Sequence, residues 1–108
     1  MNELDTKITL HIPEYFHDET GLIPIPEEIL HKLYIQLQDA KYDFFITTAE
    51  TYYKNRTYTT KLVTSYTTNN DQKPISIFKQ WFKNNNDKLK QESLAYEYNN
   101  KLFIEELE

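Results

Sequence analysis

The chain has 108 residues, a formal net charge of −5 at pH 7 and no cysteine. Its length fits a single domain over residues 1–108, and the missing cysteines exclude disulfides and thiol chemistry. No apolar run approaches the length of a membrane-spanning helix, and the first residues lack a signal-peptide pattern. We therefore expect a cytoplasmic protein without a membrane partner.

The charges are unevenly distributed along the chain. Residues 1–50 carry ten acidic and three basic side chains, residues 51–91 carry eight basic and two acidic ones, and residues 92–108 carry five acidic and one basic one. A basic segment between acidic ends either binds an anionic partner or pairs with those ends inside the fold. The single arginine among many lysines fits an AT-rich gene, such as one on a mobile genetic element.

The N-terminal part begins with one clear strand signal. Residues 7–12 alternate apolar and polar types, which predicts a strand that ends at Pro13, and residues 13–20 are predicted as a loop. The polar residues of this region lack any spacing typical of metal ligands; they are His11, His17, Asp18 and Glu19. We therefore predict no metal site and no cofactor.

Residues 21–46 carry the clearest start and stop signals. The apolar residues 22–25 follow Gly21 and predict a short strand, and Pro26 suits the first position of a helix. Two acidic residues then fall in the first turn, where the helix dipole favours negative charge. The next apolar residues, up to Leu33, recur at helical spacing, so we predict a helix with one apolar face.

The segment after Leu33 allows two structures. Leu33, Ile35 and Leu37 alternate with polar residues, which favours a strand, but Leu33 and Leu37 are also four apart, which suits a helix running to residue 38. We prefer a short helix that ends at Leu33, followed by extended chain and a turn near Asp39. Residues 42–46 are rich in aromatic and β-branched types and predict the next strand.

Residues 21–46 resemble the core of the AbrB/MazE-like swapped-hairpin domains. That pattern has a glycine, a short apolar strand, an Ile-Pro pair that opens a short helix, a helix-ending leucine and a turn into a strand. The matching positions are Gly21, Ile23, Ile25, Pro26, Ile29, Leu33, Ile35, Leu37 and Asp39. The family's two later glycines are Tyr34 and Gln38 here, and Leu22 stands where a basic residue often follows the first glycine. The resemblance implies an interleaved homodimer that binds DNA as a regulator or antitoxin.

The threonine- and tyrosine-rich residues 47–68 predict a hairpin with its turn around Asn55. On the second strand we expect Tyr58, Leu62 and Tyr66 to face the core and Val63 to face solvent. Asp71 or Ser76 is a candidate cap for the helix that follows.

Residues 75–89 carry apolar residues at helical intervals, which predicts the longer helix, with a break at the three asparagines 84–86. Residues 94–104 predict a second hairpin that turns at Asn99 and Asn100, because asparagine tolerates positive φ.

These elements together predict an α+β fold. We expect a small, mostly antiparallel sheet, or a partly closed barrel, with one short and one longer helix on one face. The predicted core consists of the residues that share the apolar face of each element. They are Ile25, Ile29, Leu33, Leu37, Phe44, Leu62, Phe78 and Phe82.

The sequence favours binding over catalysis. It has no glycine-rich phosphate loop and no recognisable nucleophile–base arrangement, so we predict that the protein is not an enzyme. The first hypothesis is a regulator that binds nucleic acid, RNA or single strands more than duplex DNA, because cations meet phosphates and aromatic rings stack on unpaired bases. The predicted contacts are Lys54, Arg56, Lys61, Tyr53, Tyr58, Lys79 and Lys83.

The alternative hypothesis is an inhibitor or antitoxin that acts by protein–protein contact, with its acidic ends meeting a basic target. Charge segregation supports both hypotheses. They differ in whether the basic residues are exposed together or are paired within the fold.

Overall fold

The architecture is a five-stranded antiparallel sheet with two helices. The computed structural model describes residues 3–53 and 55–107, without the side chains of Tyr53 and Arg56. The elements are β1 (Thr6–Pro13), β2 (Tyr15–Asp18), β3 (Gly21–Pro24), α1 (Glu27–Asp39), β4 (Phe45–Tyr53), β5 (Arg56–Thr67), α2 (Lys73–Leu89), β6 (Ser93–Tyr98) and β7 (Lys101–Glu106). The main sheet has the order β4-β5-β1-β6-β7, and β2 pairs with β3 in a separate hairpin.

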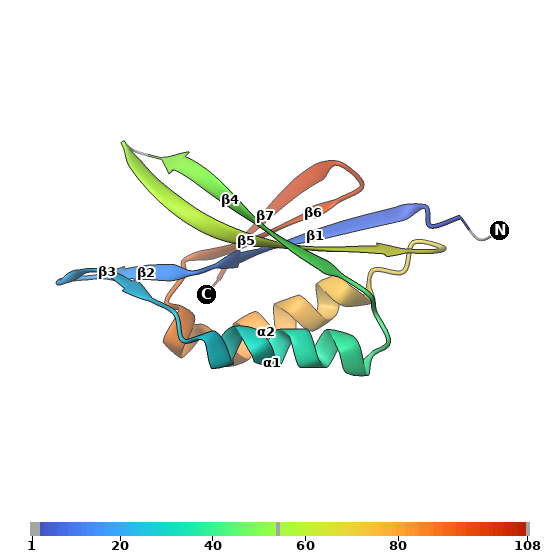
Figure 1. Cartoon of the computed structure of the whole chain (residues 1–108), viewed down its shortest axis with the longest axis horizontal. Helices are drawn as coiled ribbons and strands as arrows, with labels where there is room; N and C mark the ends of the chain where they lie inside the picture. The colour runs from blue at the N-terminus through green and yellow to red at the C-terminus, as the bar shows by residue number, and fades with distance from the viewer. Residues whose placement is uncertain (1–2, 54, 108) are drawn as a thin grey trace.

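The predicted α+β class is confirmed, and the sheet is open rather than closed into a barrel, with β4 and β7 at its edges. Both helices lie on the same side of this sheet (Figure 1). Within the described residues, neither helix is long and apolar enough to cross a lipid bilayer.

The hydrophobic core lies between the sheet and the helix layer. Ile8 and Leu10 of β1 point into it, because alternate residues of a strand share a face. Phe78 and Trp81 of α2 fill much of its volume, and the Trp81 indole N–H donates a 2.8 Å hydrogen bond to the carbonyl of Ile29 on α1. This bond satisfies a buried polar group and links the two helices.

The preferred short helix ending at Leu33 is wrong, and the alternative longer helix is present. Helix α1 runs from Glu27 to Asp39, so the expected strand over residues 33–37 is absent. Leu33 and Leu37 are fully buried, whereas Ile35 points to solvent. Burial of residues four apart stabilises helix over strand, because both then share the face that packs on the core.

The predicted faces of β5 are reversed at its centre. Val63, expected in solvent, is fully buried, whereas Tyr66 is exposed and Leu62 lies on the open face outside the core. The pairing with β1 explains this, because Val63 lies opposite the buried Leu10 and therefore shares its face. Threonine on both faces hides the orientation of this strand in the sequence.

Most of the other predicted core residues are buried. Ile25, Ile29, Phe78 and Phe82 belong to the core together with the two helix leucines, and Phe44 packs against the core and is partly buried. Leu62 is the member of the predicted core that the structure places elsewhere.

Two further predictions are corrected. Residues 13–20 are not a simple loop, because they contain β2, which pairs Phe16 with Ile23 of β3 across a turn that Gly21 permits with φ 124°. Helix α2 continues through the three asparagines without a break. The Asn85 amide donates to the Trp81 carbonyl at 2.8 Å, and the helix ends at Leu89, followed by the C-cap residue Lys90 with φ 51°.

Both predicted hairpins are confirmed. Strands β4 and β5 pair up to Tyr53 and Arg56, β6 and β7 turn at residues 99–100, and Asn55, Asn99 and Asn100 all have positive φ. Positive φ at both loop residues of the second hairpin matches the twist of the flanking strands. The sequence therefore located these turns from residue type alone.

Candidate binding site

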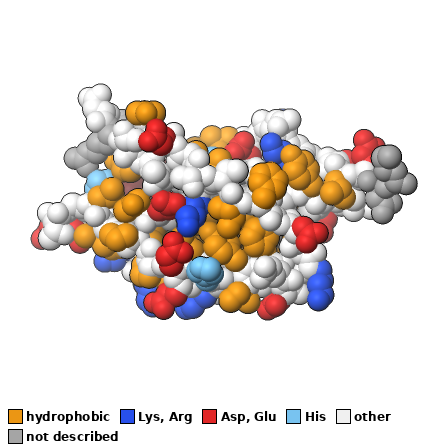
Figure 2. All heavy atoms as spheres, viewed as in Figure 1, with side chains coloured by type: hydrophobic (Ala, Val, Ile, Leu, Met, Phe, Trp, Pro, Cys, Tyr) orange, Lys and Arg blue, Asp and Glu red, His pale blue; other side chains and the backbone are white. Residues whose placement is uncertain are grey.

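The predicted nucleic-acid contacts lie on several elements. Lys54 is outside the described residues, and the side chains of its neighbours Tyr53 and Arg56 are not described either. Lys61 and Tyr58 have opposite parity on β5 and therefore point to opposite faces of the strand. Lys79 and Lys83 belong to α2, on the helix side of the sheet. The structure therefore does not bring the described members into one patch, and on the face seen in Figure 2 the basic side chains are dispersed among acidic and hydrophobic ones.

Two of these lysines are paired with carboxylates from the acidic parts of the chain. The Lys61 ammonium lies 3.4 Å from a carboxylate oxygen of Glu27, and that of Lys79 lies 2.8 Å from one of Glu105. The second pair raises the pKa of Lys79 and lowers that of Glu105, chiefly through their hydrogen bond. At these positions the basic residues of segment 51–91 pair with acidic residues inside the fold, which is the second of the two possibilities that the charge distribution left open.

The two remaining described members differ in their surroundings. The Tyr58 hydroxyl lies 3.2 Å from Nε2 of His17, and the two rings meet edge to face, so Tyr58 anchors the β2–β3 hairpin against β5. Lys83 lies on the exposed side of α2. Tyr58 thus has a packing role that the sequence did not suggest.

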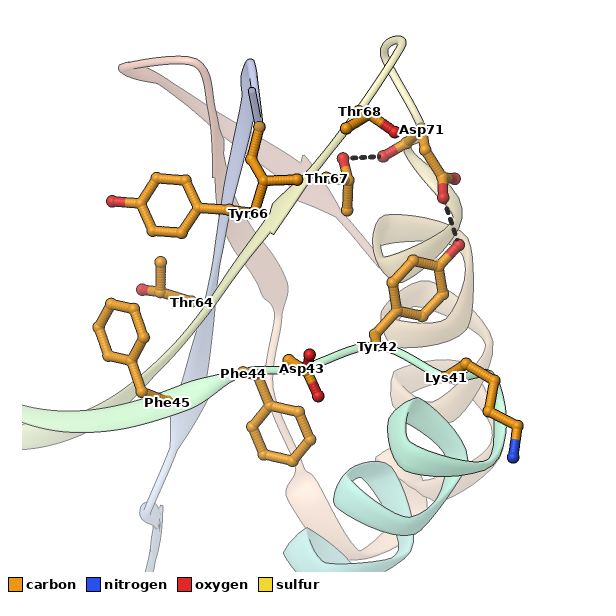
Figure 3. Close-up of a pocket in the computed structure, with 11 residues that line it drawn as sticks. Lys41, Tyr42, Asp43, Phe44, Phe45, Thr64, Tyr66, Thr67, Thr68 and Asp71 are labelled. Atoms are coloured by element: carbon orange, nitrogen blue, oxygen red, sulfur yellow. Dashed lines mark hydrogen bonds between the residues drawn. The ribbon is translucent and has the colours of Figure 1, made fainter. Parts of the chain in front are cut away.

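A hollow in the described surface lies elsewhere, where the loop after α1 enters β4. Its volume is about 450 Å³, which is within the usual range for ligand sites. The lining residues come from this loop, the start of β4, the end of β5 and the turn before α2 (Figure 3). They are Leu4, Lys41, Tyr42, Asp43, Phe44, Phe45, Thr64, Tyr66, Thr67, Thr68 and Asp71.

An exposed aromatic pair forms one wall of this cavity. Phe45 on β4 and Tyr66 on β5 stack with ring centroids 6.5 Å apart and an angle of 24° between their planes. About half of each side chain is exposed, at 51% and 46%. Figure 3 shows both rings on the same side of the strands, whereas Phe44 points the opposite way. Stacked rings left open to solvent provide a flat apolar surface for a partner group.

The Asp71 carboxylate, another part of the lining, is held in place by two hydrogen bonds. The Tyr42 hydroxyl donates a 2.6 Å hydrogen bond to one oxygen of Asp71, and the Lys73 amide donates to the other at 3.1 Å. The first of these bonds is the main reason why the pKa of Asp71 lies below its ordinary value. Desolvation, followed by the bond to Asp71, raises the pKa of Tyr42 to about 12. Asp71 therefore stays ionised and Tyr42 stays protonated at neutral pH.

The electrostatic environment of the cavity favours a cation. Asp43 and Asp71 both line it, and α1 ends beside it without a basic residue in its last turn. The C-terminal end of a helix carries partial negative charge, which adds to that of the carboxylates. Lys41 also belongs to the lining, but Figure 3 shows its ammonium directed away from the aromatic pair. The cavity thus combines aromatic faces with negative charge.

Sequence reasoning missed this site. Phe45 was placed in a strand, Tyr66 was assigned to the core, and Asp71 was considered only as a helix cap. The N-cap of α2 is Gln72, and Asp71 accepts a hydrogen bond from the Lys73 amide at the start of the helix. The available signal was the high aromatic content of residues 42–46, but the sequence does not show that β5 places Tyr66 beside them. No group of three or more potential metal-binding side chains occurs in residues 3–53 and 55–107.

Comparisons with protein-family models, with curated protein sequences and with solved structures each found no match for this chain.

Proposed function

We propose that this chain is a small non-enzymatic protein that acts by binding a basic segment of another protein, as an inhibitor or antitoxin does. The observation that carries the proposal is the open cavity whose lining includes both the stacked Phe45 and Tyr66 and the carboxylates Asp43 and Asp71. An arginine or lysine side chain is the protein group that matches both kinds of lining. Its stem or guanidinium plane lies against the rings, and its charge is neutralised by the carboxylates.

The charges of the chain support a cationic partner over an anionic one. The net charge is −5, so a basic protein is attracted and a nucleic acid is repelled at long range. Phosphate would also meet Asp43 and Asp71 in the cavity, and like charges brought together disfavour binding. Lys61 and Lys79, which would contact phosphates in the other hypothesis, already have carboxylate partners.

Binding of a labelled arginine-rich peptide, followed by fluorescence anisotropy, tests the proposal. The purified protein should bind this peptide, and added salt should weaken the complex because the attraction is electrostatic. Asp43→Asn and Tyr66→Ala should each weaken binding several-fold. The first variant removes a negative charge, and the second removes one of the two stacked rings. A cation held over an aromatic ring contributes about 0.5–2 kcal/mol, which corresponds to a factor of about 2–30 in affinity.

Two matched variants control for net charge and for loss of an exposed tyrosine. Asp87→Asn alters the charge equally, and Asp87 lies 14 residues, or about 21 Å, along α2 from the helix start beside the cavity. Tyr52→Ala removes a more exposed tyrosine from the other end of β4. Both should bind the peptide as the parent does. Equal losses in the controls, or no binding by the parent at low salt, would refute the proposal.

The nucleic-acid interface around Asn55 stays a prediction, and the same assay examines it with single-stranded RNA in place of the peptide. In that hypothesis the triple change of Lys54, Arg56 and Lys61 to glutamine reduces both affinity and salt dependence, because fewer counterions are released. RNA binding that depends on these three residues, together with no peptide binding, would replace the present proposal with the nucleic-acid one.

A further inference from the structure

Strand β7 forms an open edge of the sheet. It pairs with β6 on one side, and no described strand pairs with its other side. The tight two-residue turn makes Tyr98 and Lys101 the first hydrogen-bonded pair of the hairpin. Because such pairs alternate along antiparallel strands, the backbone N–H and C=O groups of Leu102, Ile104 and Glu106 point outward from the sheet. These groups form a ready template for another strand.

The side chains of this edge are unusually apolar for a free strand. Leu102, Phe103 and Ile104 are consecutive, and their exposed fractions are 57%, 39% and 64%. Free edges are normally protected by a proline, a bulge or a central charge, and the centre of β7 has none of these. The other edge, β4, carries threonines and Glu50 along its middle. The unprotected edge is therefore β7.

We propose that two copies of this chain associate by antiparallel pairing of their β7 strands about a two-fold axis at Phe103. This two-fold axis is perpendicular to the sheet, so it pairs residues that share a face. The two sheets then form one continuous ten-stranded sheet with the helices of both copies on the same side. In this register Leu102 of each copy lies opposite Ile104 of the other, and these residues carry the outward-pointing backbone groups. They form hydrogen-bonded pairs on both sides of the axis.

The side chains of the two copies complement each other in this register. They do not do so in the two neighbouring symmetric registers, whose axes lie one residue to either side. Lys101 of each copy lies opposite Glu105 of the other, and Glu105 also pairs with Lys79 of its own copy at 2.8 Å. Phe103 meets the Phe103 of the other copy and extends the existing stack with Tyr96, whose ring centroid is 5.4 Å away. An axis at Ile104 would place Phe103 against Glu105, and an axis at Leu102 would place Phe103 against Lys101. The apolar residues at the centre of β7 thus pair with each other, and the opposite charges on either side of them pair as well. This match indicates that a second copy of the chain occupies the edge.

The first test is the molecular mass of the protein in sedimentation equilibrium. A contact of one strand pair is small, so the dimer should be weak and should dissociate on dilution. The mass should rise from 13.1 kDa towards twice that value between micromolar and millimolar concentration. Ile104→Lys should abolish the rise, because it adds a charge at the centre of the contact. The control Ile35→Lys changes an isoleucine of similar exposure on α1 and should leave dimerisation unchanged.

The second test fixes the register and uses the absence of native cysteine. Opposed residues at a non-hydrogen-bonded position have Cα atoms about 4.5 Å apart, which is within the range of disulfides. Phe103→Cys should therefore form a covalent dimer under mild oxidation. Ile104→Cys should form it much more slowly, because its two copies lie about 8 Å apart in this register.

The outcomes separate the proposal from its rivals. A parent that stays monomeric at millimolar concentration overturns it, and so does a dimer that persists in Ile104→Lys while that variant retains the parent's circular dichroism and melting temperature. Faster crosslinking of Ile104→Cys than of Phe103→Cys would overturn the register. Concentration-dependent mass together with selective crosslinking at position 103 supports both the surface and its partner.

Discussion

Replacement of Leu33 by alanine tests the central packing of the fold. Leu33 lies on the buried face of α1 and is fully enclosed in the core that α1 shares with α2 and β1. The sequence also allowed this residue to sit in a strand together with Ile35 and Leu37. The variant therefore measures both how tightly the core is packed and whether this segment is helical.

The expected loss follows from the atoms removed. Leu33→Ala deletes three buried carbon atoms, and at about 0.8 kcal/mol for each methylene the transfer contribution is about 2.4 kcal/mol. A residual cavity of about 50 Å³ adds about 1.2 kcal/mol at about 24 cal/mol per Å³. The free energy of unfolding should thus fall by about 3–4 kcal/mol. This is a large part of the total unfolding free energy of a typical domain, which is roughly 5–15 kcal/mol. The melting temperature should fall by about 15–25 °C.

Urea unfolding followed by far-ultraviolet circular dichroism measures this change, and Ile35→Ala is the matched control. Ile35 lies two residues away on the same helix with 54% of its surface exposed, so its replacement should alter stability by less than about 0.5 kcal/mol. Equal losses for the two variants would mean that Leu33 and Ile35 share a face, as in a strand. An unchanged midpoint for Leu33→Ala would remove this residue from the core.

Two further predictions concern side-chain hydrogen bonds. Tyr42→Phe removes the donor to Asp71 and should cost about 1 kcal/mol at neutral pH. The lowered pKa of Asp71 means that this stabilisation is present above its unfolded-state pKa and is lost as the pH falls through the folded-state value, so parent and variant should converge in acid melting experiments. Trp81→Phe removes the bond to the Ile29 carbonyl and part of the core volume. It should cost about 2–4 kcal/mol in urea unfolding, and a loss below about 1 kcal/mol would show that the link between the helices is dispensable.

The candidate cavity was the least predictable feature. Its aromatic wall needs Phe45 and Tyr66, which are 21 positions apart, and only the register of β4 with β5 brings them together. The carboxylate of Asp71 reaches the same place because Tyr42, in the loop after α1, hydrogen-bonds it across 29 positions. Side-chain types and spacing along the chain contain no signal for such long-range contacts.

The predicted basic cluster shows the converse limitation. Lys61 and Lys79 are near other cations in the sequence, but the fold places each beside a carboxylate from an acidic end. Local charge density along a chain describes a surface only where the cations share a face and have no internal partners. The family resemblance of residues 21–46 and the interleaved dimer that it implies stay predictions.

The sequence by itself determined the features that depend on neighbouring residues. Asparagine at Asn99 and Asn100 located a turn because few other residues tolerate positive φ, and Pro26 marked the start of α1 because proline needs no hydrogen-bond partner there. The tertiary structure alone decided the faces of β5 and the length of α1. Val63 is buried because β1 places it opposite Leu10, and α1 continues past Leu33 because the core covers both Leu33 and Leu37. In both cases the local pattern fitted two structures, and burial of apolar surface against distant residues selected one.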